Sequence, residues 1–163
     1  FALCYDDDRV ADDYIDRLLD AISKTDADVI VFDQLCTHVK EGKIEHCRYG
    51  LGYKYETGLM QGNGRCTRCG QLPLTAMPAG PSVGVCAGVT SCNPAGEWWW
   101  RGLPAHTMAW RTETVNMVEF PDLTFSEDMS FVREACKRAK TEYRIEGWTG
   151  YYYNFHSERT ATR

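Results

Sequence analysis

Three adjacent aspartates near the start of the chain, Asp6, Asp7 and Asp8, are the first residues whose types suit chemistry. They follow a short apolar run, residues 1–5, which predicts a buried strand that ends at the mouth of a sheet. Crowded carboxylates repel one another, and Mg²⁺ or Mn²⁺ removes that repulsion because these ions prefer hard oxygen ligands. The same residues also suit a turn and a helix cap, so the motif alone leaves both interpretations open.

A second acidic pair, Glu127 and Asp128, follows Ser126. Ser126 is a good N-cap, so we predict a helix from there through about residue 139. The helix dipole favours anions in the first turn, and an ionised Asp128 there is suited to accept a proton from a hydroxyl group. Acidic residues in a first helical turn are also ordinary capping chemistry.

The eight cysteines fall into two groups. Cys4, Cys36, Cys47 and Cys136 are scattered, and we interpret them as small core residues in a reducing compartment, the cytoplasm. The others cluster in a segment rich in Gly and Pro, and a Cys-x-x-Cys pair is typical of a structural zinc site. Their second pair is spaced by five residues, so zinc, disulfides and free thiols all remain open for Cys66, Cys69, Cys86 and Cys92.

Aromatic and basic residues supply two further candidate groups. Aromatic faces suit both sugar rings and a hydrophobic core. The candidates for an acceptor or sugar platform are Trp99, Trp100, His106 and Trp110. In the basic tail, His156, Arg159 and Arg163 together suit a diphosphate.

The composition bounds these interpretations. The chain has 163 residues, about one domain, with a net charge of −5 that argues against a nucleic-acid partner. No apolar run reaches the roughly 18–20 residues of a membrane span, and no signal-peptide pattern is present. The acidic beginning suits a cation and the basic end suits phosphate, although two solvated faces of opposite charge explain the same pattern.

The elements that must position these residues read as an α/β domain. An apolar stripe predicts a helix beginning at Asp12 or Asp13, and residues 28–32 read as a buried strand. With residues 1–5 they form a βαβ unit, so we expect a parallel sheet with the aspartates at its carboxyl end. The remaining expectations are a hairpin over 39–44, an irregular insertion over 57–97, a strand over 107–111, a strand over 143–145 and an extended segment over 148–155.

Taken in order, these pieces resemble the family-2 glycosyltransferases of GT-A fold, most closely the small bacterial and phage members. The resemblance covers nearly the whole chain except 57–97, and it is carried by residues 4–10, 13–19, 27–32, 102–111, 120–122, 126–131, 151–156 and 159–163. It implies a single domain over 1–163, the C-terminal part of a GT-A unit. Its Rossmann-like mixed sheet is flanked by helices, and the insertion over 57–97 is either irregular or stapled by zinc.

The resemblance also implies roles. Asp6, Asp7 and Asp8 bind Mn²⁺ or Mg²⁺ and the diphosphate of a nucleotide-sugar donor, although Tyr5 stands where the family has its first aspartate. Asp128, with Glu127 beside it, is the base that activates an acceptor hydroxyl in an inverting displacement. His156, Arg159 and Arg163 face the departing diphosphate.

The family's first strands and most of its nucleoside pocket precede these motifs. The resemblance therefore implies either a truncated chain or a partner that supplies that half, and we expect the 163-residue chain alone to transfer sugar poorly. Two other classes are open: a non-catalytic, zinc-stabilised module that binds carbohydrate or a protein, and a metal-dependent phosphotransferase or hydrolase. The last class is the weakest, because the sequence has no glycine-rich phosphate loop after a strand.

Overall fold

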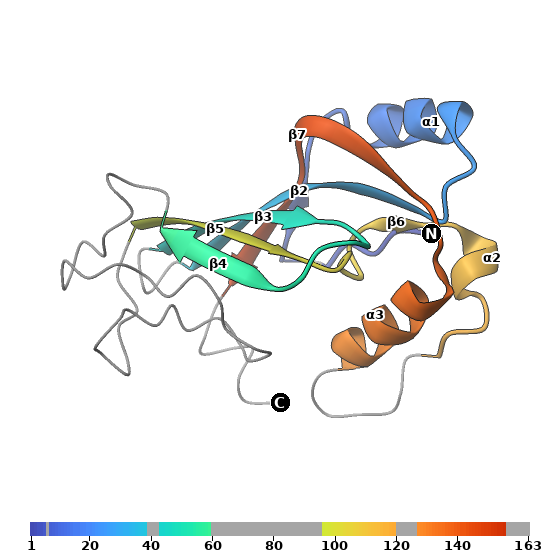
Figure 1. Cartoon of the computed structure of the whole chain (residues 1–163). Helices are drawn as coiled ribbons and strands as arrows, with labels where there is room; N and C mark the ends of the chain where they lie inside the picture. Colours follow the sequence, from blue (N-terminus) through green and yellow to red (C-terminus); the bar gives the residue numbers. More distant parts are fainter. Residues whose placement is uncertain (6, 39–42, 60–95, 120–126, 156–163) are drawn as a thin grey trace.

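The computed structural model describes residues 1–5, 7–38, 43–59, 96–119 and 127–155. They form a mixed α/β structure around one seven-stranded sheet of order β1-β7-β2-β3-β5-β4, with β6 paired to β2 (Figure 1). The strands are β1 (Arg9–Val10), β2 (Val29–His38), β3 (Lys43–Tyr49), β4 (Glu56–Leu59), β5 (Gly96–Gly102), β6 (Ala109–Trp110) and β7 (Glu142–Phe155). The helices are α1 (Tyr14–Lys24), α2 (Thr112–Val115) and α3 (Glu127–Arg138).

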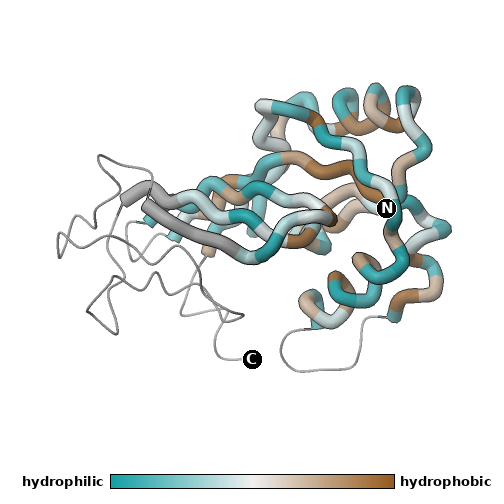
Figure 2. Tube along the Cα trace, in the orientation of Figure 1, coloured by the Kyte–Doolittle hydropathy of each residue, from teal (hydrophilic) through white to brown (hydrophobic). Residues whose placement is uncertain are grey.

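The centre of the sheet is the parallel pair β2 and β7. Residues 29–32 of β2 are at most 5% exposed, as expected for an apolar run covered on both faces of a sheet. Figure 2 shows this stretch as a brown segment between α1 and α3. The antiparallel pairing of β2 with β3 confirms the predicted hairpin, whose turn at 39–42 lies outside the described residues.

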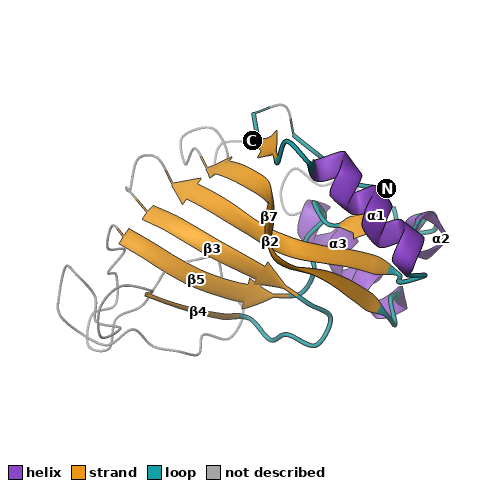
Figure 3. Cartoon of the chain, turned by 90° about the horizontal axis from the view of Figure 1, so that it is seen from above, coloured by secondary structure: helices purple, strands orange, loops and turns teal. Residues whose placement is uncertain are grey.

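Helices α1 and α3 lie on opposite faces at the same end of the sheet (Figures 1 and 3). Both helices were predicted from their apolar spacing, and both are confirmed. The buried stripe of α1 is narrower than expected: Tyr14, Leu18 and Ala21 face the sheet. Ile15, Leu19 and Ile22 are more than half exposed because, among the described residues, only one side of α1 packs against a neighbour.

The predicted βαβ unit is wrong in its first strand. Residues 1–5 form no strand, and Cys4 is exposed rather than a core residue. They are linked to the sheet by a pair of backbone hydrogen bonds between Phe1 and Trp110, with lengths of 3.0 and 2.7 Å, and by the Tyr5 N–H, which donates to the Tyr151 hydroxyl. The strand that precedes α1 is β1, which pairs antiparallel with β7. An apolar run predicts burial, but it does not specify a pairing partner.

The two segments expected over 143–145 and 148–155 form one bulged strand, β7. Its register against β2 shifts between the pairs Val31–Arg144 and Asp33–Thr149, so β7 has extra residues opposite Phe32. Gly147 lies in this bulge with φ of 64°, a conformation that glycine adopts without steric cost. The bulge bends β7 and allows one strand to pack against α1 and continue along β2.

The predicted insertion over 57–97 is described only at its two ends, where β4 and β5 pair antiparallel. Residues 60–95 lie outside the described part of the chain, so the insertion stays a prediction. No helix among the described residues has the length and apolar character needed to cross a membrane.

Candidate functional site: an aspartate, histidine and aspartate from three segments

Asp8 is attached to the central strand β7 by two hydrogen bonds. The Tyr151 hydroxyl donates to Asp8 Oδ2 at 2.7 Å, and the Asn154 backbone N–H donates to Asp8 Oδ1 at 3.0 Å. Burial raises the pKa of Asp8, and the two hydrogen bonds offset that rise only in part. The site therefore holds a half-buried carboxylate whose negative charge a bound cation would stabilise.

The other two aspartates of the triplet differ from Asp8. Asp7 is exposed, and its backbone carbonyl accepts a hydrogen bond of 3.2 Å from the Asn154 side chain. Asp6 lies outside the described residues. Asp7 and Asp8 thus lie beside the same end of β7, with their carboxylates in different environments.

His106 links this segment to α3. Its ring packs edge-on against Tyr5, with centroids 5.4 Å apart, and its Nδ1 lies 3.6 Å from Asp128 Oδ2. Burial lowers the pKa of His106, and the charges of Asp128, Asp8 and Glu127 oppose that shift without cancelling it. The ring is therefore neutral at pH 7. Among the described residues, nothing hydrogen-bonds its buried Nε2.

Asp128 lies in the first turn of α3, as the sequence predicts. Its Oδ1 accepts the backbone N–H of Met129 at 2.7 Å, while Oδ2 faces His106. The side chain keeps 34% of its surface exposed, so a substrate hydroxyl can reach it. Tyr5 lies near the same carboxylates. Burial raises the pKa of Tyr5, and the charges of Asp128, Glu127 and Asp8 raise it further.

The predicted aromatic platform does not form around His106. Trp110 is 2% exposed, packs against Phe131 and donates its indole N–H to the Ala105 carbonyl at 3.1 Å, so it offers no face to a sugar. Trp99 and Trp100 instead line an open pocket of about 550 Å³ together with Asp33, Arg48 and Arg101. Within the described ranges, the lining of that pocket includes none of Asp8, His106 and Asp128.

Several predicted site residues cannot be placed. The tail residues predicted to bind a diphosphate and the four clustered cysteines lie outside the described residues. They are His156, Arg159, Arg163, Cys66, Cys69, Cys86 and Cys92. Their roles stay predictions.

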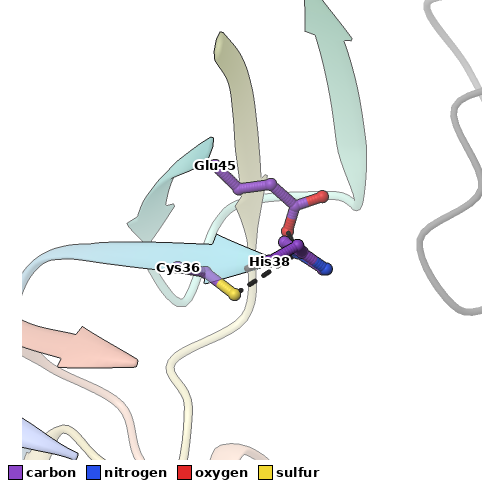
Figure 4. Close-up of side chains that lie close together, drawn as sticks. All are labelled: Cys36, His38 and Glu45. Atoms are coloured by element: carbon purple, nitrogen blue, oxygen red, sulfur yellow. Dashed lines mark hydrogen bonds and ion pairs between the residues drawn. The ribbon is translucent and has the colours of Figure 1, made fainter. Parts of the chain in front are cut away.

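Sequence reasoning missed a second cluster, formed by Cys36, His38 and Glu45 (Figure 4). Their three ligand-type atoms lie within 4.8 Å of one another, and all three residues are buried. The available signal was weak: Cys36 and His38 are two apart and so share a face on a strand, but the predicted strand ended at residue 32. Only the hairpin register brings Glu45 opposite Cys36.

No family model matches the chain, and neither a curated protein nor a solved structure matches it significantly. The functional argument therefore depends on the residues and their geometry.

Proposed function

We propose that the chain carries the catalytic centre of a metal-dependent, inverting glycosyltransferase that moves a sugar from a nucleotide-diphosphate donor to an acceptor hydroxyl. The observation that carries the proposal is the meeting of three distant segments at His106. The ring contacts Tyr5, faces Asp128, and is affected by the charge of Asp8. Such a transfer needs one carboxylate that binds a cation and a second carboxylate that acts as a base.

The donor set fits a hard divalent cation. Asp8 has two ordered oxygens, each held by one hydrogen-bond donor, so each retains a lone pair for a metal. Asp7 is exposed nearby and completes an oxygen-rich group suited to Mn²⁺ or Mg²⁺. A bound ion of this kind supplies Lewis-acid stabilisation of a leaving diphosphate.

In the proposed reaction Asp128 takes the proton of the acceptor hydroxyl. The resulting oxygen attacks the anomeric carbon from the face opposite the diphosphate. The bond between that carbon and the diphosphate oxygen breaks, and the nucleoside diphosphate leaves with the electron pair. Asp128 Oδ2 faces His106 Nδ1 at 3.6 Å, while the Met129 N–H holds the other oxygen.

Manganese binding tests the cation half of the proposal. We expect the electron paramagnetic resonance signal of free Mn²⁺ to decrease when the protein is added with UDP or GDP. Asp8→Asn should reduce that binding by about tenfold or more, since it removes a charged ligand. Asp20→Asn, on the exposed face of α1, is the matched control. Absence of nucleotide-dependent Mn²⁺ binding in the unaltered chain would overturn the proposal.

Turnover tests the base half, and it is measured in a full-length form that also carries the nucleoside-binding half, because we expect the 163-residue chain alone to transfer sugar poorly. Asp128→Asn keeps the size and the Met129 hydrogen bond but cannot accept a proton, so we expect kcat to fall about 10²–10⁴-fold with donor binding retained. Glu113→Gln, on the short helix α2, is the control that should leave kcat unchanged. Unchanged turnover in Asp128→Asn would remove that residue as the base.

The pocket lined by Trp99 and Trp100 favours a second candidate, a non-catalytic carbohydrate-binding module. That candidate predicts oligosaccharide binding that Trp99→Ala weakens and that needs neither nucleotide nor Mn²⁺. Binding of sugar without any binding of nucleotide would favour the module over the transferase.

A further inference from the structure

One face of the β2–β3 hairpin carries four buried groups that are unusual neighbours in a core. Cys36 and His38 come from β2, and Lys43 and Glu45 come from β3. The register places Cys36 opposite Glu45 and His38 opposite Lys43, so all four side chains lie on the same side of the sheet. Each is at most 8% exposed.

His38 faces two partners with a single ring nitrogen. Its Nε2 lies 3.4 Å from Cys36 Sγ and 3.3 Å from Glu45 Oε2 (Figure 4). A ring nitrogen has either one proton or one lone pair, so it cannot fully satisfy a thiol donor and a carboxylate acceptor together. A cation between the three atoms removes this conflict, because each atom then directs a lone pair at the ion.

The spacing of the three atoms agrees with one tetrahedral ion. Zinc bonds of about 2.3 Å to sulfur and about 2.0–2.1 Å to nitrogen and oxygen imply separations of about 3.6 Å for sulfur and nitrogen and about 3.3 Å for nitrogen and oxygen. The observed separations are 3.4 and 3.3 Å. The sulfur and the oxygen lie within 4.8 Å of one another, so small side-chain rotations would complete the group.

We infer that Cys36, His38 and Glu45 bind one borderline divalent ion of the zinc class, with a fourth position open to a further donor. The combination of thiolate, imidazole and carboxylate selects Zn²⁺ over Mn²⁺ or Mg²⁺, which prefer oxygen donors. The site is therefore chemically distinct from the Asp7–Asp8 group. It is also independent of the proposed transferase activity.

Lys43 positions the carboxylate. Its Nζ contacts Glu45 Oε1, which is the oxygen that does not face His38. A hydrogen-bonded outer oxygen keeps a carboxylate ligand oriented and bound through its other oxygen. Lys43 also supplies the competing explanation, because its ammonium alone neutralises Glu45 in a closed ion pair.

The two explanations differ in the state of the sulfur. In a closed ion pair Cys36 is a thiol, since burial raises the pKa of Cys36 well above its usual range. In a metal site the ion displaces that proton and Cys36 is a thiolate ligand. A measurement that reports the number of thiolates on the bound ion separates them.

The test loads the metal-free, reduced full chain with ¹¹³Cd²⁺ and records its ¹¹³Cd resonance, and then repeats the loading with Co²⁺ and records its absorption. We expect a resonance typical of one sulfur with nitrogen and oxygen donors, and a thiolate-to-cobalt charge-transfer band. Cys36→Ser should abolish both signals. Cys47→Ser is the matched control, because Cys47 is equally buried on the same face and its Sγ interacts with the Glu45 carbonyl and with the Tyr49 side chain.

Three outcomes overturn the inference. Failure of either ion to bind indicates the closed Lys43–Glu45 pair. A resonance typical of four sulfurs alone assigns the ion to Cys66, Cys69, Cys86 and Cys92. Equal loss of signal in both serine variants shows that Cys36 has no specific role. The cadmium shift of the unaltered chain decides the matter even if Cys36→Ser does not fold.

Discussion

At the scale of single residues, Tyr151 does most to position Asp8. Its ring is fully buried, its hydroxyl donates to Asp8 Oδ2, and its hydroxyl oxygen accepts the Tyr5 backbone N–H at 3.2 Å. The hydroxyl therefore joins the segment before α1 to the central strand β7. Its loss would leave a carboxylate oxygen and a backbone N–H without their partner.

Tyr151→Phe should lower the free energy of unfolding by about 1–3 kcal/mol, the cost of unsatisfied buried polar groups. It should also raise the pKa of Asp8 further, because the lost hydrogen bond favours the carboxylate. Urea unfolding and carboxyl NMR titration measure the two effects. Tyr152→Phe, whose ring stacks under Arg9 on the other side of β7, should change neither by a comparable amount. Equal effects from both substitutions would contradict this account.

At the scale of elements, the contact between α1 and β7 depends on a small residue. Gly150 lies on β7 under two buried aromatic rings, and a Cβ there would come within 2.7 Å of Phe32 and of Trp148. Those rings also pack against Tyr14 of α1, with centroids 5.7 and 6.0 Å from its ring. A methyl group at Gly150 would therefore push apart the layer that holds α1.

Gly150→Ala should cost about 1–3 kcal/mol of stability through overpacking. Gly52→Ala is the matched control, because nothing lies within 4 Å of a Cβ at that position. Thermal unfolding of the two variants measures the difference. If both variants unfold at the wild-type temperature, the aromatic layer is looser than described.

A second contact between elements is made by Asp28, which joins the start of β2 to α2 and to the loop before β7. Its Oδ2 accepts the backbone N–H groups of Lys140 and Thr141 at 2.8 and 3.0 Å, and its Oδ1 accepts the Thr114 hydroxyl at 3.0 Å. The Lys140 hydrogen bond is the main reason that the pKa of Asp28 is lowered. One carboxylate thus connects the start of β2 to α2 and to the loop between α3 and β7.

The lowered pKa makes the contribution of Asp28 dependent on pH. The folded chain binds this proton more weakly than the unfolded chain does, so the stabilisation is complete above the unfolded pKa of about 3.9 and is lost as the pH falls through the folded pKa. We expect Asp28→Asn to lower stability by about 2–3 kcal/mol at pH 7, with the difference from wild type narrowing below about pH 4. Asp26→Ala removes only an exposed ion pair with Arg111 and should cost less than about 1 kcal/mol. Urea unfolding at several pH values measures both variants, and a difference that widens in acid would contradict the assignment.

At the scale of the whole molecule, the central feature is the convergence of Tyr5 and Asp8 with His106 and the start of α3. Asp8 and His106 lie on opposite sides, in the sequence, of the longest stretch that the structure does not describe, residues 60–95. Because the charges of Asp8 and Asp128 both raise the pKa of His106, that imidazole is a probe of their proximity. No enzymatic assay is needed to use it.

An NMR titration of His106 in the metal-free chain should show a pKa lowered by Asp128→Asn and, separately, by Asp8→Asn, since each substitution removes a charge that favours the imidazolium. Asp128→Asn should have the larger effect, because Asp128 is the stronger of the two influences. Asp20→Asn, on the exposed side of α1, should leave the titration unchanged. An unchanged pKa in both site variants would show that the segments do not meet in solution.

Local features of the sequence predicted α1, α3, the hairpin and the acidic first turn of α3, because spacing, caps and turn residues act over a few positions. The first strand was predicted wrongly, since the five apolar residues before Asp6 contain no information about which strand they would meet. Trp110 was proposed for a binding surface and lies in the core, because an aromatic ring suits both environments.

The sequence by itself therefore determined α1, α3, the apolar start of β2 and the hairpin, together with the residue types that are available for chemistry. Only the tertiary structure decided that Asp8 and Asp128 share His106, that β7 is the parallel partner of β2, and that Glu45 lies opposite Cys36. The physical reason is that periodicity and capping are properties of neighbouring residues. Strand pairing and the meeting of charges depend instead on which distant surfaces bury the most apolar area together.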